Sequence, residues 1–354
     1  MPAPDLAPVL GVSVPIVQAP MLGVSTPALA AAVSNAGGLG SIAIAAYPVE
    51  SARRLIEDTR ALTTRPFNVN VFCFDAPKRD TVVEAGWISH LKPFFAEVDG
   101  VPPTALRAVY GRLGDNEDLA QMLLEVQPPV VSFHFGLPAA EFVAALKAAG
   151  IRTMATATNL EEADAIERLG IDVIVAQGVE AGGHRGLFNL KGRDPHLSTY
   201  TLVRLLAREA RIPIVAAGGI MDGAGIRAAL TLGASGVQMG TAFILCPESA
   251  ADANYRAALK SARTHDTQFT SAISGRPARG LVGRLTAVGA TPGCPEIPDF
   301  PVAYYAAKSL DAAARAKGRY DFAPCWAGQG APLVREMPAA ELIAQLVREM
   351  SPAA

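Results

Sequence analysis

The chain has 354 residues, half of them hydrophobic and 18% charged, and its formal net charge is −2. This composition is typical of a globular protein with a large core. Because the chain has no basic excess and no cluster of Lys and Arg, it does not resemble a nucleic-acid-binding protein. A small molecule is therefore the expected partner.

The longest uncharged segment, residues 6–49, is predicted to be a buried strand, a helix and a second strand. Pro15, Pro20, Pro27 and the pair Gly37-Gly38 divide it into short pieces, and no basic region precedes it. These features argue against a signal peptide or a membrane span.

Eight short apolar runs, each followed by a turn signal, predict eight parallel strands. Most are followed by a segment of helical periodicity. The runs span residues 15–20, 39–44, 67–72, 129–135, 152–157, 172–178, 213–219 and 235–242. Eight such units favour a TIM (β/α)8 barrel over an open doubly wound sheet, as do the Gly-rich turns after the last two runs. The helices that follow the fifth and seventh runs have predicted N-caps at Asn159 and Asp222. Gly170 and Gly233 mark the predicted C-terminal ends of the same two helices.

Two segments do not follow the repeat. Residues 74–113 form a long connection between the third and fourth strands, and residues 246–309 are rich in Gly and Pro. Connections of this length are commonly lids or small subdomains. We therefore expect a barrel at 1–245, a small subdomain or lid at 246–309, and a segment at 310–354, including an amphipathic helix at 338–350, that packs back on the barrel.

His134 lies in the fourth apolar run, VVSFHFG. Because side chains alternate along a strand, Ser132 and His134 share one face, and Phe133 and Phe135 share the other. In a barrel, His134 points inward at the C-terminal end of its strand, and the two phenylalanines pack against the helices. Taken alone, this histidine fits a core residue as well as an active-site residue.

A second histidine, His184, follows the sixth run in the sequence GVEAGGHRG. It comes directly after Gly182 and Gly183, which allow a ligand to approach the backbone closely. Two histidines at one barrel mouth favour the functional interpretation of His134.

The glycine-rich turns after the seventh and eighth runs predict an anion site made of backbone amides. Gly218, Gly219, Gly240 and Thr241 are its candidate residues. The chain has neither a GxGxxG motif after a strand nor a GxxxxGK[ST] motif, so a mononucleotide phosphate is the expected anion.

Together these motifs resemble those of the class I nitronate monooxygenases. The similarity extends over nearly the whole chain and includes WAGQG at 326–330. The matching segments are QAPM (18–21), VSNAGGLGS (33–41), FNVN (67–70), SFHFG (132–136), EAGGHRG (180–186) and AAGGI (216–220).

The widely spaced cysteines predict no metal site and fit a reducing cytoplasm. The resemblance implies a TIM-barrel enzyme with non-covalently bound FMN that oxidises alkyl nitronates with O2, with propionate 3-nitronate as the expected substrate. Nitrite or nitrate and a carbonyl compound are the products, through one-electron transfer to the flavin. A homodimer is possible. His134 and His184 are the implied catalytic residues. The implied cofactor-binding residues are Met21, Asn70, Gln177, Gly182, Gly183, Gly218, Gly219, Gly240, Thr241, Gln329 and Gly330.

The resemblance also implies a substrate pocket made by Tyr110, Tyr255, Tyr304 and Lys308. Phe300 departs from it, because a further tyrosine is expected there. A nitronate is already deprotonated, so the site needs hydrogen-bond donors and a dry pocket rather than a strong base. His134 is the expected donor, with a pKa near neutrality, and His184 is expected to assist.

Three alternatives remain at this stage. An FMN-dependent enoyl-acyl-carrier-protein reductase that uses NAD(P)H has the same barrel and an AGGH-type turn, but SFHFG is not expected in it. A non-catalytic flavin-binding protein has no need of two histidines. A purine-nucleotide dehydrogenase requires a nucleophilic cysteine, for which Cys73 is the nearest candidate. The four cysteines are too far apart in sequence to predict a disulfide framework or a zinc site.

Overall fold

The computed structural model describes residues 4–351 and confirms the predicted barrel. Eight parallel strands form one sheet in the order β1-β9-β8-β6-β5-β4-β3-β2, and a bridge between Val17 and Leu39 joins its two edges. The strands are β1 (Ile16–Gln18), β2 (Gly40–Ala43), β3 (Phe67–Phe72), β4 (Val130–His134), β5 (Arg152–Ala157), β6 (Val173–Gln177), β8 (Ile214–Ala217) and β9 (Gly236–Met239). Each lies within one of the eight predicted runs.

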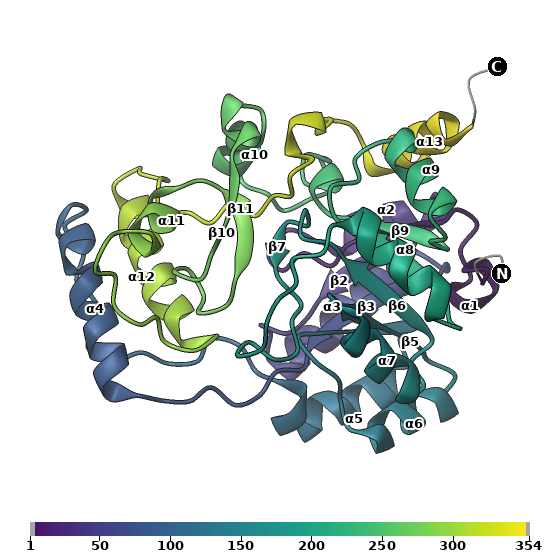
Figure 1. Cartoon of the computed structure of the whole chain (residues 1–354), viewed down its shortest axis with the longest axis horizontal. Coiled ribbons are helices and arrows are strands. Elements are labelled where there is room, and N and C mark those ends of the chain that lie inside the picture. Colours follow the sequence, from purple (N-terminus) through teal and green to yellow (C-terminus); the bar gives the residue numbers. More distant parts are fainter. Residues whose placement is uncertain (1–3, 352–354) are drawn as a thin grey trace.

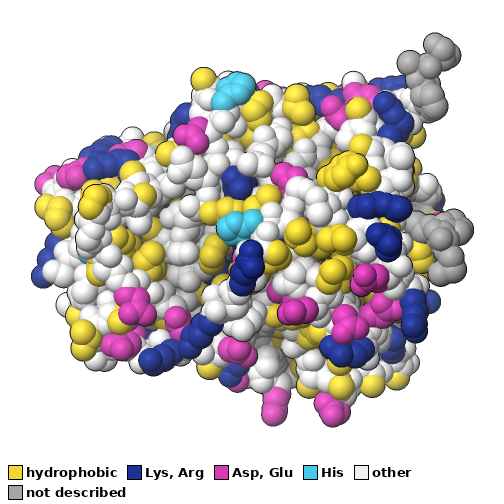
Figure 2. Space-filling model, viewed as in Figure 1, with side chains coloured by type: hydrophobic (Ala, Val, Ile, Leu, Met, Phe, Trp, Pro, Cys, Tyr) yellow, Lys and Arg dark blue, Asp and Glu magenta, His cyan; other side chains and the backbone are white. Residues whose placement is uncertain are grey.

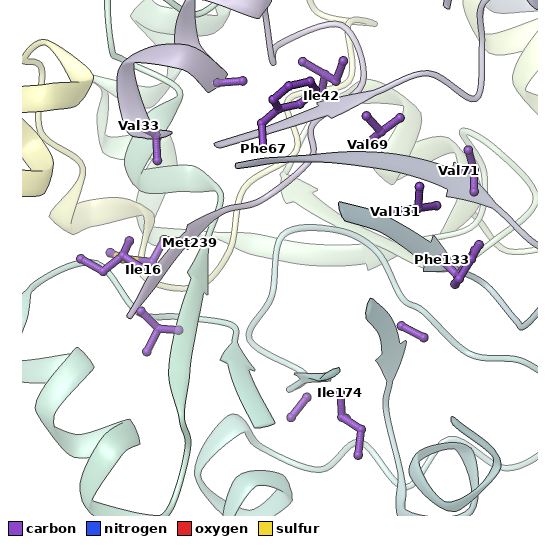
Figure 3. Packing of buried hydrophobic residues seen from close by; sticks show 14 of the residues in the cluster. Ile16, Val33, Ile42, Phe67, Val69, Val71, Val131, Phe133, Ile174 and Met239 are labelled. Carbon is purple, nitrogen blue, oxygen red and sulfur yellow. The ribbon is translucent and has the colours of Figure 1, made fainter. Parts of the chain in front are cut away.

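Helices cover the outside of the barrel (Figure 1). They are α2 (Pro27–Asn35), α3 (Val49–Leu62), α5 (Glu117–Val126), α6 (Ala140–Ala148), α7 (Leu160–Arg168), α8 (Thr199–Glu209), α9 (Gly223–Thr231) and α13 (Ala339–Met350). Figure 3 shows strand residues such as Val69 and Phe133 in the large apolar cluster that these helices complete. The side chains of Asn159 and Asp222 accept hydrogen bonds from Glu162 and Gly225, as the predicted caps require.

A separate apolar cluster closes the N-terminal end of the barrel. Leu6 and Leu10, next to and within α1 (Ala7–Leu10), pack with inward-facing strand residues such as Val173 and Val215. Within residues 4–351 this end is therefore filled by side chains, and the opposite end, where the strands finish, is the expected place for a ligand.

A smaller unit lies beside the barrel, at the left of Figure 1. It contains α4 (Thr81–Ala96), α10 (Ala253–Leu259), β10 (Thr267–Thr270), β11 (Ala278–Leu281), α11 (Arg284–Gly289) and α12 (Val302–Ala316). Most of these elements come from the segment after the last barrel strand, where a subdomain or lid is expected. Four short 3-10 helices complete the elements: η1 (Leu113–Asp115), η2 (Thr241–Phe243), η3 (Ala262–His265) and η4 (Ala331–Leu333).

The packing of this unit favours boundaries for the smaller unit that differ from the expected limits at residues 246 and 309. Trp87, Leu91 and Phe95 of α4 share a buried cluster with Leu310 of α12, and α12 continues past residue 309. We propose that the smaller unit consists of residues 74–112 together with 246–326. In residues 4–351, no helix is both long and apolar enough to cross a membrane.

Charged side chains of both signs are interspersed over the face shown in Figure 2. Lysine and arginine side chains alternate there with aspartate and glutamate, and neither sign gathers into one large patch. The surface on this side therefore matches the balanced composition of the chain.

Candidate active site at the C-terminal ends of the barrel strands

A large cavity opens where the barrel strands end and the smaller unit begins. It holds about 1370 Å³ of space between atoms, including its open mouth. Both His134 and His184 line it, as do most of the residues implied to bind the cofactor or substrate. The implied cofactor and substrate residues that line the cavity are Met21, Asn70, Tyr110, Gln177, Gly182, Gly183, Gly218, Gly219, Gly240, Thr241, Tyr255, Tyr304 and Gly330.

His134 ends β4 and lines the cavity, but both of its ring nitrogens contact protein. Nε2 lies 3.3 Å from the carbonyl oxygen of His184, and Nδ1 lies 3.0 Å from the hydroxyl of Thr156. A carbonyl can only accept, so Nε2 carries the proton and Nδ1 accepts from Thr156. His134 therefore holds the His184 backbone in place.

The expected pKa of His134 near neutrality is wrong. Burial, and then the nearby Arg276 guanidinium, lower its pKa to about 4. Neutral imidazole is therefore the form present at pH 7. The expectation used the ordinary value for an imidazole, whereas the surrounding protein and the Arg276 charge both disfavour the protonated ring.

The expected orientation of Phe135 is also wrong. Phe133 packs against the helices, but the backbone at Phe135 turns to φ +78°, so strand alternation ends before it. Its ring instead lies 4.3 Å from that of His134 and 5.2 Å from that of Phe300, measured between centroids. A bulky residue in the left-handed region is uncommon and is held by its surroundings.

His184 is placed by the smaller unit together with the barrel. Gly183 and His184 form β7, which pairs with β11 so that His184 faces Ala278. Gln177, at the end of β6, donates to the His184 carbonyl and accepts from the Gly186 amide. The loop after β6 is therefore clamped between barrel and subdomain.

The hydroxyl of Ser274 determines the tautomer of His184. Ser274 is fully buried, and it lies 2.9 Å from Nε2 of His184 and 3.1 Å from the Arg276 carbonyl oxygen. Because its one proton goes to the carbonyl, the hydroxyl must accept from Nε2–H. Nδ1 of His184 makes no hydrogen bond within residues 4–351, so it keeps a lone pair for a ligand. Burial, then the neighbouring His134 and Arg276, lower the pKa of His184 to about 3.

The segment 327–330 closes over the glycine turns. The Gly328 amide donates to the Thr241 hydroxyl, and the Gln329 amide donates to the Glu180 carbonyl. Gly330 lines the cavity, whereas the Gln329 side chain is exposed and does not. Of the segment's two implied residues, only Gly330 therefore meets the cavity.

Gly183 is the position where the backbone leaves room for a flat ligand. Its φ is +75°, and a Cβ built there would meet nothing within 4 Å. Gly182 differs, because a Cβ there would lie 2.5 Å from the Gly328 amide nitrogen. Gly182 is thus required by close packing against the 327–330 segment.

The implied substrate residues form an aromatic wall. Tyr110 and Tyr304 pack edge to face with centroids 5.5 Å apart, and the Tyr255 hydroxyl donates to the Trp326 carbonyl. The Lys308 ammonium lies over both the Tyr110 and Tyr304 rings, at 4.8 and 5.0 Å. Lys308 lines a second cavity, which shares Tyr255, Tyr304 and Trp326 with the first. Phe300 is buried behind this wall and packs on His184.

Four further residues lie near the site and were not expected there from the sequence: Ser274, Arg276, Thr156 and Trp326. Trp326 lines the cavity, with its ring centroid 5.2 Å from that of His184. The available signal was SGRPARG at 274–280, which places two arginines in an otherwise uncharged stretch. Its position opposite His184 depends on a strand pairing that joins residues more than ninety positions apart.

Cys73 does not provide a reactive thiol. Its side chain is buried and its amide donates to the His134 carbonyl. Burial raises the pKa of this thiol far above its usual range. This observation weighs against the dehydrogenase alternative.

Comparison with known proteins decides the family. A family model described as nitronate monooxygenase matches residues 4–349. The chain belongs to the nitronate monooxygenase family. A nitronate monooxygenase of Pseudomonas aeruginosa is 56% identical over 341 residues, covering 96% of this chain and 97% of that protein. A nitronate monooxygenase of Paraburkholderia phytofirmans is 53% identical and covers 98% and 94%.

Solved structures agree with this family. A nitroalkane oxidase from Streptomyces ansochromogenes matches with a TM-score of 0.87 and 38% identity, over 98% of this chain and 97% of that one. FabK from Thermotoga maritima is more distant, with a TM-score of 0.70 and 28% identity over 98% of this chain and 95% of that one. The family resemblance seen in the motifs is therefore confirmed, and the chain is a flavin-dependent nitronate monooxygenase by family.

Proposed function

We propose that this nitronate monooxygenase binds FMN in the cavity at the strand ends and uses O2 to oxidise alkyl nitronates. Propionate 3-nitronate is the proposed substrate, and nitrite or nitrate and a carbonyl compound are the products. The observation that carries the proposal is the neutral His184 beside the open backbone at Gly183, in one cavity.

The residues of the cavity fit FMN. The space next to Gly183 suits a flat ring, and the turns at Gly218, Gly219, Gly240 and Thr241 suit a phosphate. Met21, Asn70, Gln177 and Gly182 would surround the ring, with Gly330 and the backbone of Gln329 above the phosphate turns. Bound there, FMN would supply the electron acceptor for the reaction.

The protein's own residues prepare the cavity for an anionic substrate. The aromatic wall of Tyr110, Tyr255 and Tyr304 excludes water, and Lys308 lies at its edge to attract a carboxylate. His184 offers Nδ1 as a proton acceptor, while Nε2–H stays bonded to Ser274. His134 keeps the His184 carbonyl in place.

The experiment is a visible spectrum of the purified protein, followed by anaerobic titration with propionate 3-nitronate and, separately, with NADH. We expect a yellow protein that bleaches with the nitronate and not with NADH, and a released cofactor with the mass of FMN. Bleaching by NADH alone would support the enoyl-reductase alternative. A yellow protein that neither compound bleaches would support a flavin-binding protein without catalysis.

Two further parts of the proposal concern the setting of the enzyme. The four cysteines are free, which fits a reducing cytoplasm. Homodimer formation is also proposed, and size-exclusion chromatography with light scattering measures it directly.

A further inference from the structure

Arg276 is a buried arginine that has no acidic partner. It lies in the turn between β10 and β11 with only 3% of its surface exposed. Its Nη1 donates to the Leu187 carbonyl at 2.6 Å, whereas its Nε is buried without a partner. Among the salt bridges within residues 4–351, none involves Arg276.

A neighbouring buried arginine shows the usual arrangement. Arg185 is 1% exposed, and its guanidinium is paired with Asp194 at 2.8 Å. Removing a charge from water without an ion pair to offset the loss of hydration is energetically costly. Arg276 bears this cost, which indicates a role other than stabilising the fold.

The guanidinium of Arg276 is separated from the two histidines by one layer of aromatic rings. It lies 4.2 Å from the Phe135 ring centroid and 5.7 Å from that of Phe300. The Phe135 ring lies 4.3 Å from His134 and 5.8 Å from His184, and the Phe300 ring lies 5.5 Å from His184. The unusual backbone of Phe135 thus turns its ring between the cation and the cavity.

Two acids, Glu162 and Asp75, act on this charge from nearby, but neither forms an ion pair with it. Glu162 is buried, but its oxygens accept from the amide and hydroxyl of Thr158 and from the Phe188 amide. Asp75 is exposed to solvent. Burial lowers the pKa of Arg276 to about 9, so the guanidinium is still charged at pH 7, and its charge opposes protonation of both histidines.

We propose that Arg276 is the fixed positive charge of this active site, which attracts the anionic nitronate and stabilises negative charge on the bound flavin. The inference rests on the proposed function and deepens it. With His134 and His184 both neutral, a permanent cation is needed to offset the negative charge, and a cation behind a dry aromatic layer acts over several ångströms with little screening. Because no hydrogen bond to the ligand is required, Arg276 acts electrostatically.

The first test measures the midpoint potential of the bound flavin in Arg276→Met. Loss of the cation should make the potential more negative by about 59 mV or more, the one-electron equivalent of a tenfold change. Arg276→Lys keeps a positive charge at this position, so the midpoint potential of its flavin should lie close to the wild-type value. Arg284→Met is the matched control, because the Arg284 guanidinium also lies over a phenylalanine ring, 4.8 Å from that of Phe322, but is paired with Glu97. An unchanged potential in Arg276→Met would overturn the proposal.

The second test does not depend on the flavin. Calorimetric titration with nitrite, a small anion, should show affinity about tenfold weaker in Arg276→Met than in wild type. If the Met variant does not fold, Arg276→Gln replaces it, since its amide can still donate to the Leu187 carbonyl. Equal nitrite affinity in a folded, uncharged variant would refute the role of Arg276. A colourless wild-type protein would instead refute the proposed function.

Discussion

The buried hydroxyl of Ser274 lies 2.9 Å from Nε2 of His184 and leaves Nδ1 as the ring nitrogen without a hydrogen-bond partner in residues 4–351. This relationship joins a turn of the smaller unit to the loop that follows β6. This hydrogen bond decides which ring nitrogen of His184 is left for a substrate. The Ser274→Ala variant, which lacks the hydroxyl oxygen, tests it.

Ser274→Ala should lower turnover about tenfold while the flavin stays bound, because loss of a buried partner costs about 1–3 kcal/mol and frees the ring to change tautomer. Steady-state kinetics and flavin content measure this. Ser309→Ala is the control, since that hydroxyl donates only to the Tyr305 carbonyl in its own helix. Wild-type turnover in Ser274→Ala would show that the hydroxyl does not position His184.

His134→Ala should also lower turnover and keep FMN bound. The variant loses the donor to the His184 carbonyl, although Gln177 still donates to the same oxygen at 3.0 Å. Thr156→Val tests the other side of the ring, where the hydroxyl donates to Nδ1. We expect a smaller decrease there. If His134→Ala turns over normally, His134 is a core residue.

Gly183→Val should reduce flavin occupancy. A branched side chain would enter the space beside Gly183 and would also strain a backbone with φ +75°. Gly318→Val carries the same strain at φ +69°, also with open space around it, but at the end of α12. The ratio of flavin to protein absorbance should decrease only in the first variant. A fully yellow Gly183→Val protein would contradict the proposed ring position.

Stability should decrease as the pH falls from about 6.5 toward 4. The pKa values of His134 and His184 are about 4 and 3 in the folded chain, below the unfolded value near 6.5. The unfolded chain therefore binds more protons in this window, and each histidine contributes up to about 1.4 kcal/mol of lost stability per pH unit. Urea unfolding at pH 7 and pH 5 measures this difference. His134→Phe should show a shallower dependence, and an identical slope would contradict the low pKa.

Cys73 should resist thiol reagents in the folded enzyme. It is buried and its pKa is raised by burial, whereas Cys294 is partly exposed. Labelling at pH 8 followed by peptide mass analysis should find Cys294 modified first and activity unchanged. Rapid modification of Cys73 with loss of activity would reopen the alternative of a nucleophilic cysteine.

Local sequence patterns were sufficient for the barrel and for the separate parts of the site. Apolar runs of strand length between turn signals predicted all eight barrel strands, and Asn159 and Asp222 cap their helices as expected. These features depend on neighbours along the chain, so periodicity and capping chemistry reveal them.

Lys308 and Gln329 show the limit of matching residues to a motif. Both stand at the expected positions in sequence, yet the Lys308 side chain lines the neighbouring cavity and the Gln329 side chain points to solvent. The family motif describes which residues are present, whereas their orientation depends on how α12 and the 327–330 segment pack against the barrel.

The sequence by itself determined the barrel, the family and the two histidines at its mouth, because these follow from local periodicity and from motifs that are contiguous in the chain. Tertiary structure alone decided that β11 pairs with β7, that Ser274 sets the tautomer of His184, and that Phe135 turns toward Arg276. The physical reason is that burial, pKa and hydrogen-bond partners depend on which distant segments meet, and no pattern along one segment contains that information.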